Sequence, residues 1–221
     1  MIDVRSLHKY MELDRINSIS TSTSDIQIIV LSSQYPGIYF RSCDQGNFTT
    51  SKTHGNTLTI AQRFPIWRNK ADRGRPSLSW LWTHPSLVIA LSQHHILDEL
   101  NIQVSSGSAR IDGINVRKLG GQFSGGSLQI QHSSCISATF SVTNSSISST
   151  SLQVKEECSI SASSSRVTLY ESHQPENGYH VKSINGSLLL GSRCLSGTVV
   201  EKKAGTPLYV IESDASRVEI L

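Results

Sequence analysis

One unit of about 20 residues recurs along the sequence and constrains the fold more than any other feature. In each unit apolar and polar residues alternate, a turn of small residues interrupts, and the alternation resumes, as in Ile102–Ile111. A small residue precedes each returning strand, at Gly107, Gly126, Ser145, Ser165, Gly186 and Ser216. The first five of these are almost evenly spaced, and the last interval is longer. Alternation puts the apolar side chains of a strand on one face, so each unit becomes stable only when it stacks on another.

We therefore predict an all-β fold, a β-solenoid or β-roll of stacked strand–turn–strand repeats with a period of about 20 residues. The expected parts are an N-terminal cap or tail (1–15), an irregular N-terminal β part (16–100), and a regular β-repeat part (101–221) that continues it in one domain. No stretch has the 3.6-residue periodicity of an amphipathic helix, and only Met1–Arg15 could supply a helix, as a cap.

The first hundred residues follow the same scheme less regularly. Ile19–Val30 is another alternating pair around a small-residue turn, and Phe48–Ile60 predicts a hairpin centred on His54–Asn56. The apolar run Leu87–Leu91 leads into the first clear repeat, whereas residues 64–85 break the pattern.

The serine content has its explanation in this repeat. The chain has 39 serines, 24 of them between residues 101 and 200. A disordered Ser-rich linker would lack the regularly spaced Val, Ile and Leu of the same region. We interpret the serines as the outward-facing members of the strands and as turn residues, where short side chains suit tight bends.

The run Leu97–Gly107, preceded by the apolar run and followed by further strand–turn–strand units, resembles the bacterial putative-adhesin domains of β-strand repeats. Tyr179–Leu190 is similar to the later repeats of that family and residues 19–30 to its first strands, so the resemblance covers residues 16–221. It implies a solenoid-like, all-β domain found near the bacterial cell envelope, with relatives linked to envelope-stress responses. It implies no catalytic residue.

The sequence offers little for catalysis, cofactors or metals. His94 and His95 are adjacent, so on a strand they point to opposite faces and cannot chelate one ion together. The Gly121–Gly125 segment lacks the spacing and the strand–turn–helix context of a nucleophile elbow. Carboxylates in the repeat part do not recur at equivalent positions. We expect no enzyme activity, no cofactor and no metal site.

The segment 64–85 is the candidate partner-binding site. It holds all three tryptophans, and with Arg63 five basic residues accompany one acid. Tryptophan and arginine are enriched at binding hot spots and at membrane interfaces. The candidate residues are Trp67, Arg68, Arg73, Arg75, Trp80 and Trp82. The alternative is a long hairpin whose rings cap the end of the ladder.

The candidate partners are an envelope protein, an anionic glycan or a membrane surface. The net charge of +3 is too small to indicate a nucleic-acid partner. The longest apolar run is Leu87–Leu91, so we expect no transmembrane segment. The stretch Met1–Leu13 lacks the apolar core of a secretion signal, which places the chain in the cytoplasm or in association with the envelope. The four cysteines are expected to be reduced, buried thiols.

The expected function is a non-catalytic, adhesin-like binding or scaffold module. A self-assembling scaffold, in which end strands pair with the next molecule, is the first alternative, and a carbohydrate-active β-helix enzyme is the second. The charges of Asp214, Arg217 and Glu219 are expected to protect an edge strand against such self-association.

Overall fold

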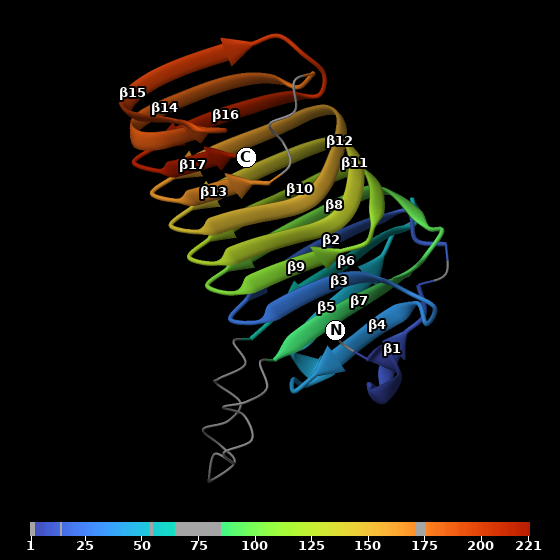
Figure 1. Ribbon diagram of the computed structural model, residues 1–221. Helices are drawn as coiled ribbons and strands as arrows, with labels where there is room; N and C mark the ends of the chain where they lie inside the picture. Colours follow the sequence, from blue (N-terminus) through green and yellow to red (C-terminus); the bar gives the residue numbers. More distant parts are fainter. Residues whose placement is uncertain (1–2, 14, 54, 65–84, 171–175) are drawn as a thin grey trace.

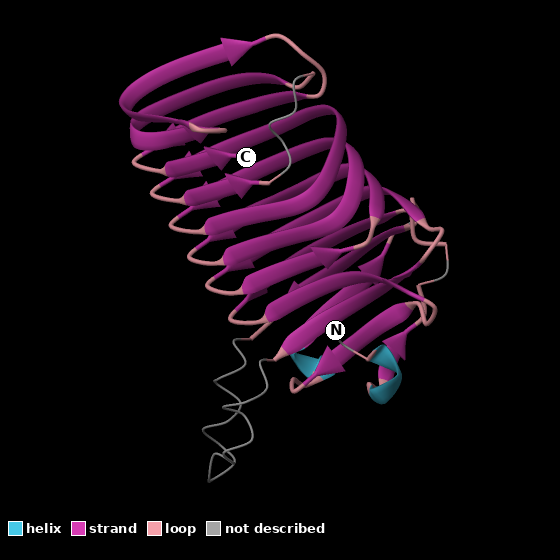
Figure 2. Cartoon of the chain, viewed as in Figure 1, coloured by secondary structure: helices cyan, strands magenta, loops and turns pink. Residues whose placement is uncertain are grey.

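The chain folds almost entirely into strands. The computed structural model describes residues 3–13, 15–53, 55–64, 85–170 and 176–221. These residues form 17 strands, hydrogen-bonded into one sheet, and two 3-10 helices of three residues each, Val4–Ser6 and Gln45–Asn47. Figure 2 shows both helices at the same end of a long stack of strands. The predicted all-β class is confirmed.

The central part of the stack is a ladder of parallel strands. Its strands are β8 (Ile96–Ser105), β9 (Ser108–Asp112), β10 (Asn115–Ser124), β11 (Ser127–Thr143), β12 (Ser146–Ser163) and β13 (Arg166–Leu169). We call two successive strand segments and the corner between them a rung. Successive rungs pair in register, so that Leu100 lies beside Leu119, Leu119 beside Ala138, and Ala138 beside Cys158. The offset between rungs is therefore nearly constant and matches the period of the sequence.

The core lies inside the rungs. Along each strand the buried positions alternate with exposed ones, and the buried side chains of all rungs form one continuous cluster. Leu100, Ile130 and Cys158 are fully buried within it. Burial of each large apolar side chain contributes roughly 1.5–3 kcal/mol to the free energy of folding. A single rung could not bury these side chains without its neighbours.

A recurrent corner explains many of the serines. At the corner between the two long faces, one residue has a positive φ, and in the described corners after the first one in the chain it is followed by glycine or serine. Ser145, Ser165 and Ser216 stack there. The Oγ atoms of Ser165 and Ser216 accept from the backbone N–H of Ser145 and Ser165 at 3.2 and 3.0 Å. At the two corners that precede Ser145 the position is glycine, Gly107 and Gly126, and a Cβ at Gly107 would collide with the carbonyl oxygen of Ile26.

The N-terminal end is built from seven strands: β1 (Lys9–Met11), β2 (Ser18–Ser24), β3 (Gln27–Ser33), β4 (Gly37–Arg41), β5 (Phe48–Lys52), β6 (Thr57–Gln62) and β7 (Ser86–Ser92). The β2–β3 rung is parallel to β8–β9 on one side and to β6–β7 on the other. Antiparallel strands then end the stack, β5 on β6, and β1 on β4 on β7. The β5–β6 pair confirms the predicted hairpin.

Residues 1–15, the one stretch that could have supplied a helix as a cap, contain no α-helix among those that the structure describes. They form the short 3-10 helix Val4–Ser6 and strand β1 instead. Val4 packs on the outer face of the stack against Ile29, Tyr39 and Val88, in a second apolar cluster separate from the core. Strand β7 is therefore buried on both faces, which explains its uninterrupted apolar run.

The C-terminal end departs from chain order. It contains β14 (Gly178–Leu190), β15 (Arg193–Lys203), β16 (Leu208–Asp214) and β17 (Arg217–Ile220). β16 pairs with β12 and with β14, and β17 with β13 and with β14. The last rung in sequence thus lies between the two that precede it (Figure 1). The idea that Asp214, Arg217 and Glu219 protect an edge is wrong, because their strands have partners on both sides.

The outermost strand at this end is β15, which runs antiparallel along β14 around the corner. Arg193 lies opposite the buried Leu190, and Glu201 opposite the buried Val181, so both face the core side. Arg193 Nη2 and Glu201 Oε1 are 3.2 Å apart. Leu195 and Val199, between them, pack on the core. An ion pair thus spans the open end of the apolar core.

Candidate functional site

All six predicted partner-binding residues, Trp67, Arg68, Arg73, Arg75, Trp80 and Trp82, lie outside the described residues. Their assignment stays a prediction. The described residues on either side of the segment 65–84 show where the two ends of this segment are attached to the stack. Gln62 Oε1 accepts from the Ser24 N–H at 2.7 Å, and the Pro85 carbonyl accepts from the Gln27 N–H at 2.9 Å. Both ends are held at the corner between β2 and β3, where the next rungs turn with only two residues between their strands.

A groove of about 520 Å³ runs along the outer face of β3, beginning at the same corner. We call it the β3 groove. Its floor is Ile29 and Leu31, and its walls come from the N-terminal segment, the β3–β4 turn and β9. Further along the ladder the same row of the outer face is polar, with Arg110 beside Ile29 and Gln129 beside Arg110. An apolar floor with polar walls is typical of ligand sites.

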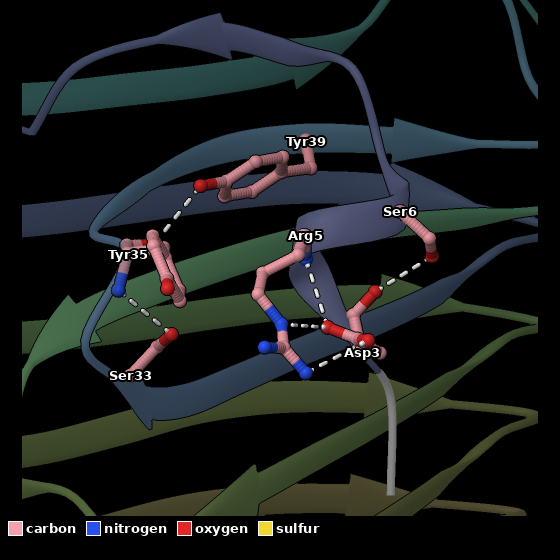
Figure 3. A network of polar contacts seen from close by, with 6 residues as sticks. All are labelled: Asp3, Arg5, Ser6, Ser33, Tyr35 and Tyr39. Carbon is pink, nitrogen blue, oxygen red and sulfur yellow. Dashed lines mark hydrogen bonds and ion pairs between the residues drawn. The ribbon is translucent and has the colours of Figure 1, made fainter.

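The first wall is fixed by the contacts shown in Figure 3. Arg5 binds Asp3 through two nitrogens, with Nε 3.1 Å from Oδ1 and Nη2 3.3 Å from Oδ2. The hydrogen bond from the Arg5 side chain lowers the pKa of the Asp3 carboxyl. Tyr39 Oη donates to the Tyr35 carbonyl oxygen at 2.9 Å, and the Tyr35 N–H donates to Ser33 Oγ at 3.1 Å. These bonds define the turn that presents the Tyr35 ring.

The opposite wall is an ion-pair cluster on β9 and β11. Arg110 Nη2 donates to Asp112 Oδ2 at 3.0 Å and to Gln131 Oε1 at 2.9 Å. His132 Nδ1 lies 3.3 Å from Asp112 Oδ1. Both carboxylates that line the groove, Asp3 and Asp112, therefore already have a cationic partner or neighbour.

Arg41 differs from the other two arginines of the groove. It is half-buried on β4, beside Ser86. No carboxylate of the described residues forms an ion pair with it. The groove therefore contains three guanidinium groups, of which two pair with carboxylates and the third, that of Arg41, has no carboxylate partner among the described residues.

Sequence reasoning missed the β3 groove. Ile29 lies in the apolar run Ile28–Leu31, where period-2 alternation does not distinguish an inward from an outward residue. The signal that could have revealed it is this run itself, because four consecutive apolar residues on a strand imply apolar side chains on both faces. Nothing in the sequence indicated that Asp3 and Arg5 would lie over β3.

The other long face of the stack carries rows of polar side chains. Asn101, Gly120, Thr139 and Ser159 lie side by side in successive rungs, next to the row Gln103, Gln122, Ser141 and Ser161. The rows agree with the prediction that serines and related residues form the outward half of the strands. Strand pairing sets neighbouring members of one row about 4.8 Å apart.

His95 and the buried cysteines occupy structural positions. His95 Nε2 lies 2.7 Å from the Ile16 carbonyl oxygen. Burial raises the pKa of the Cys43 thiol to about 11 and that of Cys135 to about 12, and it raises the pKa of Cys158 further. Cys135 and Cys158 are buried as expected, whereas the expectation is wrong for Cys194, which is exposed on β15. Within the described ranges, no three His, Cys, Asp or Glu side chains cluster as metal ligands.

Comparisons with known proteins add little. No protein-family model and no curated protein matches the chain. A solved structure of a putative cell adhesion protein from Clostridium sporogenes ATCC 15579 is 12% identical with a TM-score of 0.47, over 96% of this chain and 97% of that one. A putative adhesin from Bacteroides fragilis NCTC 9343 is 9% identical with a TM-score of 0.38, over 97% of this chain and 95% of that one. Such likeness transfers neither fold nor function. In the described part of the chain, no helix is long and apolar enough to cross a bilayer.

Proposed function

We propose that the chain is a non-catalytic binding module of the putative-adhesin type, built as a β-solenoid. The observation that carries this proposal is the register of the central ladder. Nearly constant offsets between rungs hold outward side chains in straight rows over a single core. Side chains fixed on strands lose little conformational entropy when they bind, so a rigid row suits an extended ligand.

The carboxyl groups give no support to the alternative of a carbohydrate-active enzyme. Glycosidases need one carboxyl with a raised pKa to protonate the leaving group. The pKa of Asp3 is lowered by Arg5. For Glu219 burial acts to raise the pKa, but hydrogen bonds from Arg217 and Thr168 outweigh it, and the net shift is downward. Glu99 and Glu157 lie in one outer row but are separated by Lys118 and Ser137.

The C-terminal end gives little support to the alternative of a self-assembling scaffold. Another molecule that extended the ladder there would bury the Arg193–Glu201 pair in the joined cores. Inward-facing charges on terminal strands are a recognised protection against edge-to-edge association.

The proposal is tested by titrating the full chain against immobilised envelope polysaccharides, with phospholipid vesicles in a parallel series. We expect saturable, reversible binding to one component, with no release of new reducing ends from the polysaccharide. Absence of binding to every component would refute the binding role, and release of reducing ends would establish the enzyme instead. Thr139→Arg and Ser148→Arg, on opposite outer faces, form a matched pair that reports which face is used.

A further inference from the structure

The β3 groove departs from the polar rows around it. Its floor residues are apolar, yet they lie on the outer face, where the corresponding positions of the central rungs are Arg110, Gln129 and Ser148. Val4 covers part of this apolar surface, and Leu31 is left half-exposed beside it. Ile29 is buried beneath Val4, so the folded chain keeps Leu31 as the apolar side chain that is partly open to solvent between the two charged walls.

The shape of the groove favours an extended ligand. Its lining follows β3 from Gln27 to Gln34. Eight residues of strand span roughly 25 Å. Tyr35, a residue that is 46% exposed, lies at the far end of the groove. The volume of the groove, about 520 Å³, falls within the ~300–1,000 Å³ typical of small-molecule sites.

The charges favour an anionic ligand. Three guanidinium groups, of Arg5, Arg41 and Arg110, face two carboxylates, those of Asp3 and Asp112. Arg5 and Arg110 pair with these carboxylates, whereas Arg41 has no carboxylate partner in the described part of the chain, so its guanidinium is the one that we assign to a ligand. Arginine binds carboxylates in a planar, two-pronged geometry that lysine cannot reproduce.

We propose that the β3 groove binds a carboxylated polysaccharide, with a uronic acid carboxylate on Arg41 and the apolar face of a sugar ring on Leu31. The carboxamides of Gln27, Gln34 and Gln93, which line the groove, supply partners for sugar hydroxyls. An anionic membrane fits less well, because a flat surface does not follow a trough. This inference rests on the proposed binding role and adds its site and its ligand class.

The test uses the full chain and isothermal titration calorimetry with tetragalacturonate, with its uncharged methyl ester, and with phosphatidylglycerol vesicles. We expect tetragalacturonate to bind at least tenfold more tightly than the ester, and the vesicles not to bind. Arg41→Gln should weaken tetragalacturonate binding at least tenfold. Leu31→Glu, which places a carboxylate in the floor, should abolish it.

Arg166→Gln is the matched control. Arg166 lies in the same row of the outer face as Arg41, reached through Ser86, Gln27, Ser108, Ser127 and Ser146. The substitution Arg166→Gln removes one positive charge, as Arg41→Gln does, but at a position outside the groove. Tetragalacturonate binding should therefore change less than twofold. Thermal unfolding of each variant verifies that it is folded.

Three results would overturn the inference: equal binding of acid and ester, equal losses in the two arginine variants, or preference for the vesicles. If the chain binds another envelope component while Arg41→Gln and Leu31→Glu have no effect, the groove assignment fails and the proposed binding role stands. If it binds no component at all, the binding role itself fails.

Discussion

The two ends of the stack are closed by different means. At the N-terminal end, antiparallel strands and a 3-10 helix cover the last parallel rung and bury apolar residues on its outer face. At the C-terminal end a single bent strand, β15, covers β14 and places an ion pair over the core. One end is closed by added apolar packing and the other by charge. The end with the added packing is also the end with the groove.

One row of side chains on the outer face crosses ten strands and shows this contrast between the two ends. It runs from Tyr39 and Val88 at the N-terminal end through a polar middle to Leu189 and Cys194 at the other, in the order Tyr39, Val88, Ile29, Arg110, Gln129, Ser148, Thr168, Glu219, Leu189, Cys194. Apolar residues occur at both ends of this row. Val88 is fully buried under the N-terminal segment, whereas Leu189 is only half-buried.

The largest effect should come from placing a charge at each end of this row. Val88→Asp buries an unpaired carboxylate in the outer cluster and should lower the free energy of unfolding by more than about 3 kcal/mol. Leu189→Asp leaves the charge in contact with water and should cost about 1 kcal/mol or less. Urea denaturation measures both. Similar losses would mean that the two ends are closed in the same way.

The second test removes the charge that closes the C-terminal end. Arg193→Leu with Glu201→Leu should leave folding stability nearly unchanged, because an exposed ion pair contributes at most about 1 kcal/mol. We expect the apparent molecular mass of the double variant to rise with protein concentration, whereas that of the unmodified chain stays constant. The reason is that the open end of the core becomes apolar next to the free edge of β15. Light scattering follows this, with Arg217→Leu/Glu219→Leu as an ion-pair control away from the edge. No association in the double variant would show that the charges are not what protects the edge.

The third test compares one thiol from each end. Cys194 is exposed on β15, whereas Cys43, near β4, is half-buried and has its pKa raised by burial to about 11. Because the thiolate is the reactive form, Cys43 should react with iodoacetamide at least about 100-fold more slowly at pH 7.5. Its rate should rise about tenfold per pH unit until the pH approaches 11. Mass spectrometry of quenched samples gives both rates, and a pH-independent Cys43 rate would contradict the burial of this thiol.

The smallest effect should be equal at both ends. Thr21, on β2, and Ser213, on β16, have buried hydroxyl oxygens with no hydrogen-bond partner among the described residues. A buried hydroxyl without a partner costs roughly 1–3 kcal/mol, so Thr21→Val and Ser213→Ala should each raise stability by about 1 kcal/mol. The shift in urea midpoint at constant slope measures this. A loss of stability at one end only would show that its hydroxyl does find a partner.

The central ladder was predictable from sequence because its signal is local and repeated. Each rung carries its own alternation and its own small corner residue, so the amino-acid sequence alone locates the corners at Gly107, Gly126, Ser145 and Ser165. The same pattern could not give the order of the last rungs. Strands β14 and β16 have equivalent patterns, and which of them pairs with β12 depends on long-range packing that no local period records.

The groove was beyond sequence reasoning for a different reason. Its walls come from residues 3–5, 33–35 and 110–112, which are far apart in the chain and carry no shared motif. The Trp/Arg segment was predicted from composition alone, and it stays a prediction. The described structure gives only the corner to which both of its ends are attached, beside Gln27.

The position of β16 and β17 between earlier strands restricts how far the chain can fold while it is still being synthesised. Strands β14 and β15 are synthesised before β16 and β17, the rung that lies between β14 and the pair β12–β13 in the folded protein. Folding that follows synthesis can therefore add rungs in order only as far as β13. The final four strands must assemble together once Ile220 has left the ribosome, so until that moment β12 and β13 present an unpaired edge that is prone to aggregation.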